Sequence, residues 1–423
     1  MTKNAVDPPP VCKNGPIKFQ VVPAEGLRSD YVEFILGTPL NMIITMLQQH
    51  NTLMNKLQLS FPSKNPFDRD VCIDLTMDGI RLYFEPVTQL LRLIEVYRLD
   101  LIVLQYRKST FSEPGSEASM EKVIECFGST HPGAYDDKQK MYVQSWPGLS
   151  FCFPTNDSDH VENAPGFGPN LRSLKYDASS QRHLTKISIY AGHDLAKPEQ
   201  VKVPLSCYCA QNLTKFVEAT WEDGKIVGIN VTFEAQTGEK EKGEFKVEEI
   251  TRTVRFGDTT AAVQATLGAP NKVFYKAEDK MRIHYASRTD SYQMKNKPHF
   301  FFNYFSMGFD ILFDFESKRV VKFVLHTNIP GHFDFSIYHR CNFSVFLNNE
   351  LPPITTTSKF SDFSLAFLDQ KTGNVAQPVV LQHCSGQESN PFPTTLCYGV
   401  HQLVVEVLEN EHIAGITLYD DKL

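Results

Sequence analysis

The densest group of side chains that could do chemistry lies in residues 326–341, the segment HTNIPGHFDFSIYHRC. Four side chains of metal-binding type occur in it: His326, His332, His339 and Cys341. Histidines near a carboxylate are also typical of general acid–base sites, and Asp334 lies among them. The spacing of the four metal-binding types matches no closed zinc motif. Three interpretations stay open: a turn at residues 328–331 lined by histidines, a metal or catalytic site, and an exposed recognition surface.

If the segment is a recognition surface, the turn and the residues around it are the candidates for contact with a partner protein: His326, Asn328, Pro330, Gly331, His332, His339 and Arg340. Arg340 is the best single candidate, because arginine is enriched among the residues that dominate binding energy at interfaces. An enzyme would instead need a deep pocket in which His332, His339 and Asp334 converge.

A second candidate site is basic. In the run YKAEDKMRIHY, residues 275–285, a strand would place Lys280, Arg282 and His284 on one face, where they could meet lipid phosphates. Glu278 and Asp279, which precede Lys280, also fit a solvated strand with internal ion pairs. Cys207 and Cys209 form an isolated C-x-C pair, which favours core thiols over a metal site because no second pair accompanies it.

Missing motifs and the composition argue against several classes of protein. The chain has no phosphate-binding P-loop, dinucleotide fingerprint, H-E-x-x-H or G-x-S-x-G motif, so we expect no enzyme, no cofactor and no metal. In its 423 residues, 42 Lys and Arg oppose 49 Asp and Glu, and the net charge of −7 argues against a nucleic-acid partner. No secretory signal or membrane-spanning run is visible, and nine scattered cysteines favour reduced thiols in a cytoplasmic protein.

The elements that must position these residues follow a recurring order of helix and hairpin. After Gly257, Asp258 predicts a helix N-cap and Gly268 a helix end; a hairpin is then predicted to open near Gly308. An earlier copy has Gly79 in the place of Gly308. Two further copies are predicted at residues 117–133 with 146–153 and 184–190, and at residues 358–368 with 398–419. A single hairpin is marginally stable, so such modules would share their cores.

The sequence therefore predicts an α+β fold of repeated helix-plus-antiparallel-hairpin modules packed together, with a β-rich C-terminal third. The predicted organisation is a flexible tail at 1–22, module 1 at 23–110, module 2 at 111–200 with a long loop at 154–183, a β connecting segment at 201–250, module 3 at 251–330, and a β-rich C-terminal module at 331–423 that is a possible fourth repeat.

Long, specific segments of the chain resemble the phagosome assembly factor 1 family. The resemblance covers nearly all of the chain after about residue 23, and it depends on segments such as GLRSDYVEFILGTP, DLTMDGIRLYFE, KVIECFGSTHPGAY, FFFNYFSMGFDILFD and VKFVLHTNIPGHFDFSIYHRC. The resemblance implies a non-enzymatic, cytoplasmic regulator of autophagy. Such a protein would act as an adaptor or scaffold with the autophagy machinery at the phagophore assembly site, also called the preautophagosomal structure.

The resemblance also implies a partner. We expect a β-propeller (WD40-like) protein that binds phosphoinositides, so membrane association would be indirect and would follow from protein–protein interaction. No catalytic residues are implied. The alternative is a factor in vesicle-mediated transport from the Golgi to the plasma membrane, with Golgi localisation.

Overall fold

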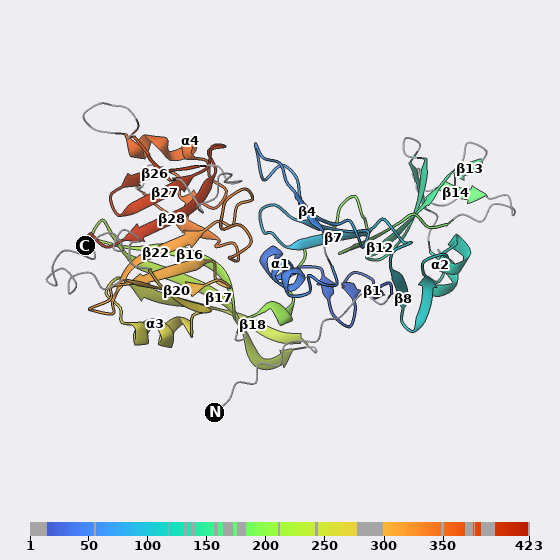
Figure 1. Ribbon diagram of the computed structural model, residues 1–423, viewed down its shortest axis with the longest axis horizontal. Helices are drawn as coiled ribbons and strands as arrows, with labels where there is room; N and C mark the ends of the chain where they lie inside the picture. The colour runs from blue at the N-terminus through green and yellow to red at the C-terminus, as the bar shows by residue number, and fades with distance from the viewer. Residues whose placement is uncertain are drawn as a thin grey trace, which may run out of the picture. The chain divides into compact units, whose positions relative to one another are not determined.

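The computed structural model divides the chain into two compact units (Figure 1). Unit 1 contains Met1–Pro62 and Phe67–Cys207, and unit 2 contains Ser63–Pro66 and Tyr208–Leu423. The structure describes residues 15–54, 56–116, 118–130, 133–136, 140–155, 160–163, 172–175, 183–209, 212–241, 244–276, 299–347, 351–368, 375, 377–381 and 394–421. The division into two units does not test the smaller modules that the sequence predicts.

Unit 1 is built from two larger sheets and a small hairpin. Its five-stranded sheet has the order β3-β2-β1-β8-β9, and its eight-stranded sheet has the order β10-β11-β12-β15-β7-β6-β5-β4. The strands are β1 (Lys18–Val22), β2 (Gly26–Arg28), β3 (Glu33–Ile35), β4 (Leu57–Ser60), β5 (Val71–Leu75), β6 (Ile80–Phe84), β7 (Leu91–Val96), β8 (Val103–Tyr106), β9 (Ser109–Ser112), β10 (Ala134–Asp136), β11 (Met141–Trp146), β12 (Leu149–Pro154), β13 (His160–Asn163), β14 (Arg172–Lys175) and β15 (Lys186–Tyr190); the helices are α1 (Leu40–Gln49) and α2 (Met120–Phe127).

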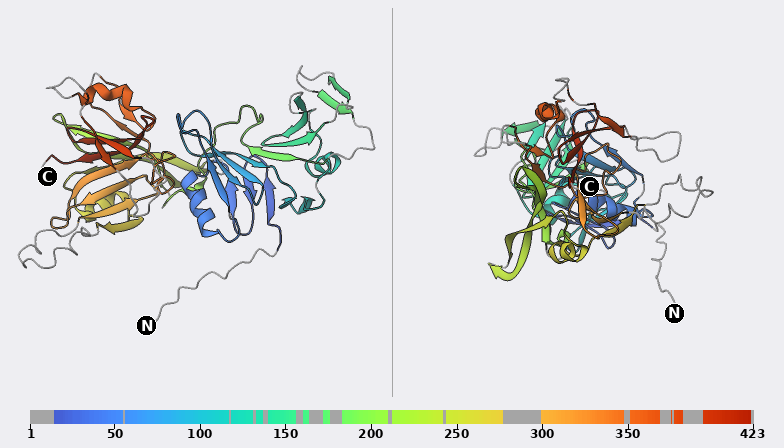
Figure 2. Two further views of the ribbon diagram at one scale, coloured as in Figure 1. Left: turned by 45° about the horizontal axis from the view of Figure 1, so that its top comes forward. Right: turned by 90° about the vertical axis from the view of Figure 1, so that its left-hand side faces the viewer.

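Unit 2 has a five-stranded sheet in the order β18-β17-β16-β23-β24 and an eight-stranded sheet in the order β19-β20-β21-β22-β28-β27-β26-β25. The hairpin of β17 and β18 projects from the rest of its sheet (Figure 2). The strands are β16 (Asn212–Glu222), β17 (Lys225–Glu241), β18 (Glu244–Arg255), β19 (Lys272–Tyr275), β20 (Phe300–Tyr304), β21 (Phe309–Phe313), β22 (Val320–His326), β23 (Phe343–Val345), β24 (Ile354–Thr355), β25 (Val379–Leu381), β26 (Thr395–Val400), β27 (Leu403–Val407) and β28 (Ile413–Tyr419); the helices are α3 (Thr260–Leu267) and α4 (Phe360–Phe363).

The two units share one strand order. In each, a three-stranded meander lies beside a parallel strand, in the pairs β1·β8 and β16·β23. In each, a four-stranded meander meets the last strand of the unit, in the pairs β7·β15 and β22·β28. Even a register shift recurs, after Tyr83 in β6·β7 and after Leu312 in β21·β22. Positions in one unit can therefore be matched to positions in the other.

The predicted α+β fold of helix-plus-hairpin modules is wrong. Among the described residues the α-helices are four short segments, none longer than the ten residues of α1, and strands dominate both units. The hairpins do not stand beside their own helices as separate modules, because further strands on both sides extend them into sheets of eight. The equivalence of the two units covers complete pairs of sheets, so the fold is mostly β.

Alternating burial explains why these segments form strands. In β5 and β6 every second side chain is buried, and the alternate side chains lie on the other face of the sheet. In unit 2 the buried face is rich in aromatic side chains, and Phe309, Phe313 and Phe323 have no exposed area. Burying such a side chain contributes about 1.5–3 kcal/mol.

The helix predicted after Gly257 is present as α3, although Thr259, and not Asp258, is its N-cap.

Two glycines allow the equivalent turns that begin β6 and β21. Gly79 and Gly308 have φ angles of +68° and +84°, a region that side chains disfavour. A Cβ atom on Gly308 would lie 2.4 Å from the carbonyl oxygen of His339 and 2.7 Å from the amide nitrogen of Cys341. The turn at Gly308 therefore lies directly against the segment that holds the predicted site.

No helix in the described part of the chain has the length and hydrophobicity needed to cross a membrane.

Candidate functional site: a buried histidine–carboxylate cluster

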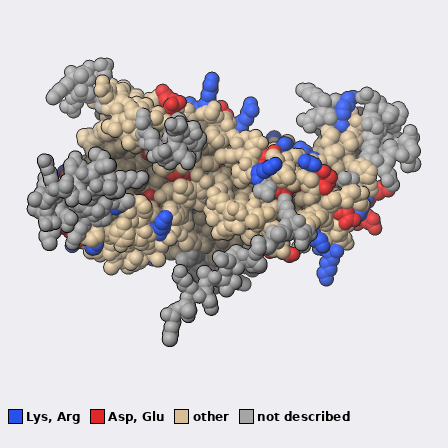
Figure 3. All heavy atoms as spheres, viewed as in Figure 1, with Lys and Arg blue, Asp and Glu red and all other residues tan. Residues whose placement is uncertain are grey.

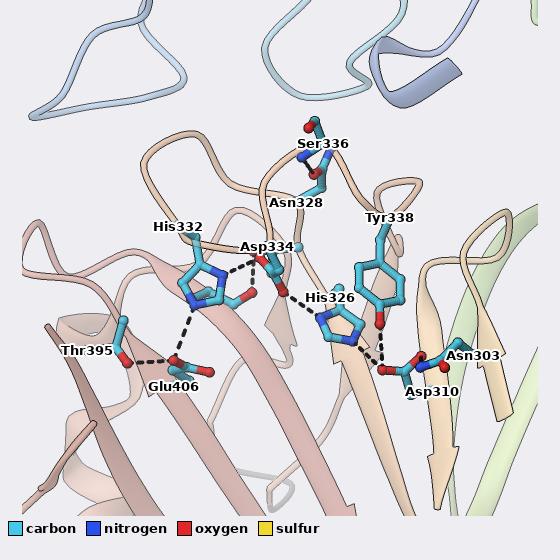
Figure 4. Close-up of polar contacts among 12 residues, drawn as sticks. Asn303, Asp310, His326, Asn328, His332, Asp334, Ser336, Tyr338, Thr395 and Glu406 are labelled. Atoms are coloured by element: carbon cyan, nitrogen blue, oxygen red, sulfur yellow. Dashed lines mark hydrogen bonds and ion pairs between the residues drawn. The ribbon is translucent and has the colours of Figure 1, made fainter. Parts of the chain in front are cut away.

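The candidate site lies at one end of the eight-stranded sheet of unit 2 (Figure 4). His326 is the last residue of β22, Asp310 is close to the beginning of β21, and Glu406 is close to the end of β27. Residues 327–342 connect β22 to β23, whereas the equivalent connection in unit 1 consists of residues 97–102. The longer connection, called the site loop below, supplies the remaining polar groups.

His326 lies between two aspartates. Its Nδ1 is 2.8 Å from Asp334 Oδ2, and its Nε2 is 3.1 Å from Asp310 Oδ2. The ring of Tyr338 stacks on the imidazole with a centroid distance of 3.7 Å, and the Tyr338 hydroxyl donates to Asp310 Oδ2 at 2.7 Å. Asn303 donates to the other oxygen of Asp310 at 2.8 Å. Both ring nitrogens of His326 and both oxygens of Asp310 therefore have partners.

His332 extends the cluster on the other side of Asp334. Its Nδ1 contacts Asp334 Oδ1, and its Nε2 lies 3.2 Å from Glu406 Oε1. The hydroxyl of Thr395 donates to the same oxygen of Glu406. Asp334 is 4% exposed and joins both histidines, so the cluster runs without interruption from β21 through the site loop to β27.

The site loop is held by further hydrogen bonds. Thr327 Oγ1 lies 2.8 and 2.7 Å from the carbonyl oxygens of Ile413 and Ala414 in β28. The amide of Ser336 donates to Asn328 Oδ1 at 2.7 Å, and Arg340 donates to the carbonyl oxygen of Thr356 at 3.0 Å. Two large apolar side chains of the loop remain exposed, Phe333 by 44% and Ile337 by 49%.

Comparison with known proteins gives a consistent result across the chain. Residues 30–419 match the model of the family described as Phagosome assembly factor 1. The chain belongs to this family. It is 53% identical over 404 residues to a PHAF1 protein of Caenorhabditis elegans, covering 95% of this chain and 94% of the relative. PHAF1 proteins of Drosophila melanogaster and Arabidopsis thaliana are 34% and 29% identical, with 96% of this chain and 94% and 93% of the relatives covered. No solved structure matches the chain.

In this phagosome assembly factor 1 family member, the carboxylates keep both histidines protonated. Burial alone would lower the pKa of His326, but its hydrogen bonds to Asp310 and Asp334 outweigh burial and raise the pKa to about 9. For His332, Asp334 and Glu406 likewise outweigh burial and raise the pKa to about 9. Burial would raise the pKa of Asp334, but the two histidines hold it well below its usual range. The cluster is therefore a set of buried ion pairs.

The family member places most of the predicted contact side chains inside the protein. Asn328, His332 and Arg340 are 1%, 3% and 6% exposed, and Pro330 is also buried. These side chains bond groups inside unit 2, Asn328 to the amide of Ser336, His332 to two carboxylates and Arg340 to the carbonyl oxygen of Thr356, as a turn lined by polar side chains would. Gly331, His326 and His339 are partly buried. Binding of a partner through other atoms of the site loop stays a prediction.

The metal interpretation also lacks support within the described ranges, where no group of three or more His, Cys, Asp and Glu side chains could hold a metal ion. His339 contacts the carbonyl oxygen of Arg340 instead of the other histidines. Cys341 is fully buried, and burial raises the pKa of its thiol. Burial also raises the pKa of Cys207, whereas Cys209 is exposed. Lys280, Arg282 and His284 lie outside the described residues.

Sequence reasoning missed four strand residues of the cluster and one residue of the site loop: Asn303, Asp310, Thr395 and Glu406, and Tyr338. A usable signal was present for two of them. Asp310 lies between Phe309 and Ile311, and Glu406 lies between Val405 and Val407, in strands that are otherwise apolar. A charged residue in such a strand needs a partner if it is buried.

Proposed function

We propose that this protein acts without catalysis, as an adaptor in autophagy that works at the phagophore assembly site together with a β-propeller protein. The family description, which names phagosome assembly, supports a role in phagosome and autophagy-related processes. The resemblance of the sequence to the family supports the more specific proposal of a partner that binds phosphoinositides.

The hydrogen bonding of the histidine–carboxylate cluster is the structural observation that supports a non-catalytic role. A general base needs a ring nitrogen or carboxylate oxygen that can reach a substrate. Here both nitrogens of His326 and of His332 are already bonded to carboxylates, and the cluster is buried. We infer that its task is to fix the site loop, so that the exposed Phe333 and Ile337 are presented to a partner in one conformation. Preorganisation of this kind lowers the entropic cost of binding.

Charge supports recruitment through a partner instead of direct lipid binding. A net charge of −7 disfavours adsorption to anionic membranes. In a flotation assay with liposomes that contain phosphoinositides, we expect the protein alone to stay at the bottom of the gradient. Addition of the β-propeller partner should bring it to the top. Strong flotation of the isolated protein would contradict this part of the proposal.

The whole proposal is tested by affinity purification of the tagged protein from fed and starved cells, followed by mass spectrometry. Recovery of a β-propeller protein with autophagy components is the expected result. Recovery of Golgi coat or tethering proteins instead would replace the adaptor role with one in vesicle transport. If a low-molecular-weight substrate is turned over by the purified protein, the non-catalytic role is wrong.

A further inference from the structure

A groove of about 940 Å³ lies on the face of β4, β5 and β6 in unit 1. All of its lining residues belong to this unit, and its size lies at the upper end of the range of ligand sites, roughly 300–1,000 Å³. Charged side chains line much of it, among them Arg69, Arg81, Arg92, Asp70, Asp74 and Glu85. Figure 3 shows basic and acidic side chains beside one another over the part of unit 1 that contains these strands.

The arginines are held in place but not fully used. The Nε of Arg81 donates to Asp74 at 2.8 Å, and the Nε of Arg92 donates to Asp70 at 2.7 Å. The terminal Nη groups of both guanidiniums have no hydrogen-bond partner among the described residues. Arg69 is exposed and likewise has none in the described part of the chain. In Arg81 and in Arg92, an aspartate that binds Nε thus orients the guanidinium, and the Nη donors stay available for a ligand.

Free acceptors occur in the same groove. Asp74 uses both oxygens, one for Arg81 and one for the hydroxyl of Tyr97 at 2.7 Å. Asp70 uses only Oδ2, and Glu85 uses only Oε2, which accepts from the amide of Thr88. The groove therefore offers arginine donors and carboxylate acceptors together, and a ligand that satisfies it must bring both.

The equivalent place in unit 2 shows that the fold does not require arginines there. Tyr83 and Arg92 lie at the register shift of β6·β7, and Leu312 and Val321 take their places at the register shift of β21·β22. Leu312 and Val321 are 2% and 8% exposed, so they add to the core of unit 2. Arg81 has the buried Asp310 as its counterpart, so the arginine lining is a property of unit 1, and this favours a binding role over a structural one.

We propose that this groove binds an extended peptide segment of a partner protein that carries acidic and basic side chains in alternation. Arg69, Arg81 and Arg92 oppose four carboxylates (Asp68, Asp70, Asp74 and Glu85), so the lining has a slight negative excess and disfavours a purely anionic ligand. One side of the groove is β4, the edge strand of the eight-stranded sheet. An added peptide strand could pair with that edge while its side chains meet the charges, which is a common mode of peptide recognition.

The inference is independent of the autophagy role, because it can be tested with the purified full-length chain. The probe is a short fluorescein-labelled peptide with the repeating sequence Thr-Asp-Thr-Lys, and the readout is fluorescence anisotropy. We expect saturable binding that weakens with salt. Arg92→Gln should weaken it about tenfold, as expected for loss of a charge-assisted hydrogen bond. Arg92→Lys keeps the charge but loses the planar fork, so it should have an intermediate effect.

Two further variants separate binding from folding. Ser60→Trp fills the groove from the exposed edge strand without removing a charge, and it should also abolish binding. Arg98→Gln is the matched control, because Arg98 pairs with Asp100 in the same unit and does not line the groove. Equal affinity for wild type, Arg92→Gln and Ser60→Trp would overturn the proposal. Tighter binding of an all-Asp peptide or of phosphoinositide vesicles, or self-association blocked by Ser60→Trp, would also overturn it.

Discussion

Arg81 in unit 1 and Asp310 in unit 2 occupy the same position of the same strand order, yet they have opposite charges. Each follows its turn glycine by two residues and pairs with the preceding strand, Arg81 with Asp74 and Asp310 with Asn303. Each also contacts the residue at one further equivalent position. Arg81 lies over the ring of Tyr97, which follows Val96, and Asp310 bonds His326, which follows the equivalent Leu325. In unit 2 the site loop completes the polar cluster, whereas in unit 1 the shorter connection has no counterpart of Asp334.

Asp334 is expected to be the most important side chain of the cluster for stability. Asp334→Ala removes a shared partner of His326 and His332 and leaves buried imidazoles short of a carboxylate. Breaking a buried ion pair costs about 3–5 kcal/mol. Urea unfolding, monitored by circular dichroism, should show this loss of free energy of unfolding. The control Glu316→Gln changes an exposed carboxylate of the same unit and should shift the free energy by less than about 0.5 kcal/mol.

Stability should depend on pH in a direction set by the two histidines. Their pKa values are about 9 in the folded protein and near 6.5 when the chain is unfolded. A raised folded pKa means that the stabilisation is complete below about pH 6.5 and is lost as the pH rises through about 9. The urea concentration at the unfolding midpoint should therefore decrease as the pH is raised from about 6.5 to about 9. In His326→Gln this decrease should be smaller, and an unchanged decrease would rule out His326 as one of its sources.

The turn at Gly308 provides a prediction with a close internal control. Gly308→Ala places a Cβ atom 2.4 Å from the carbonyl oxygen of His339 at a residue with φ of +84°. Gly257 has a similar φ of +82°, but a Cβ atom there would meet nothing within 4 Å. We expect Gly257→Ala to cost about 1 kcal/mol through backbone strain alone and Gly308→Ala to cost clearly more. Thermal unfolding of both variants measures the difference, and equal melting temperatures would contradict it.

Partner binding is expected to depend on the exposed apolar residues of the site loop. The double variant Phe333→Ser with Ile337→Ser should lose most of the partner in co-purification, because large side chains dominate binding energy. Its melting temperature should stay near that of the wild type, since both side chains are largely exposed. Leu365→Ser is a suitable control, because Leu365 is 69% exposed in the same unit but lies outside the loop. Retention of the partner by the double variant would exclude this contact.

The sequence was sufficient to predict local turns and a helix, but it was insufficient to predict how the strands pair into sheets. The turns at Gly79 and Gly308 and the helix after Gly257 follow from residue types within a few positions of each other. The eight-stranded sheets depend on pairings such as β7·β15, which join residues far apart in the chain, and no local pattern specifies them. For this reason helix and hairpin signals suggested an α+β fold, although the protein is mostly β.

The candidate site illustrates the same difference. The segment HTNIPGHFDFSIYHRC is the densest polar group that the sequence shows, and in the structure Asp334 contacts two of its histidines. Its burial was not foreseen, because the partners Asp310 and Glu406 come from strands that precede and follow it in the chain. Exposure depends on which strand ends lie beneath a loop, and that is settled only when the sheet forms.

The position of β28 has a consequence for synthesis on the ribosome. This strand lies between β22 and β27 in the eight-stranded sheet, but it follows every other strand of unit 2 in the chain. Until it has left the exit tunnel, the two halves of that sheet have no common neighbour, and the carbonyl oxygens of Ile413 and Ala414 that hold Thr327 are missing. A nascent chain therefore has to wait with exposed strand edges, and a premature stop codon shortly before Ile413 would leave unit 2 as a substrate for chaperones and proteases.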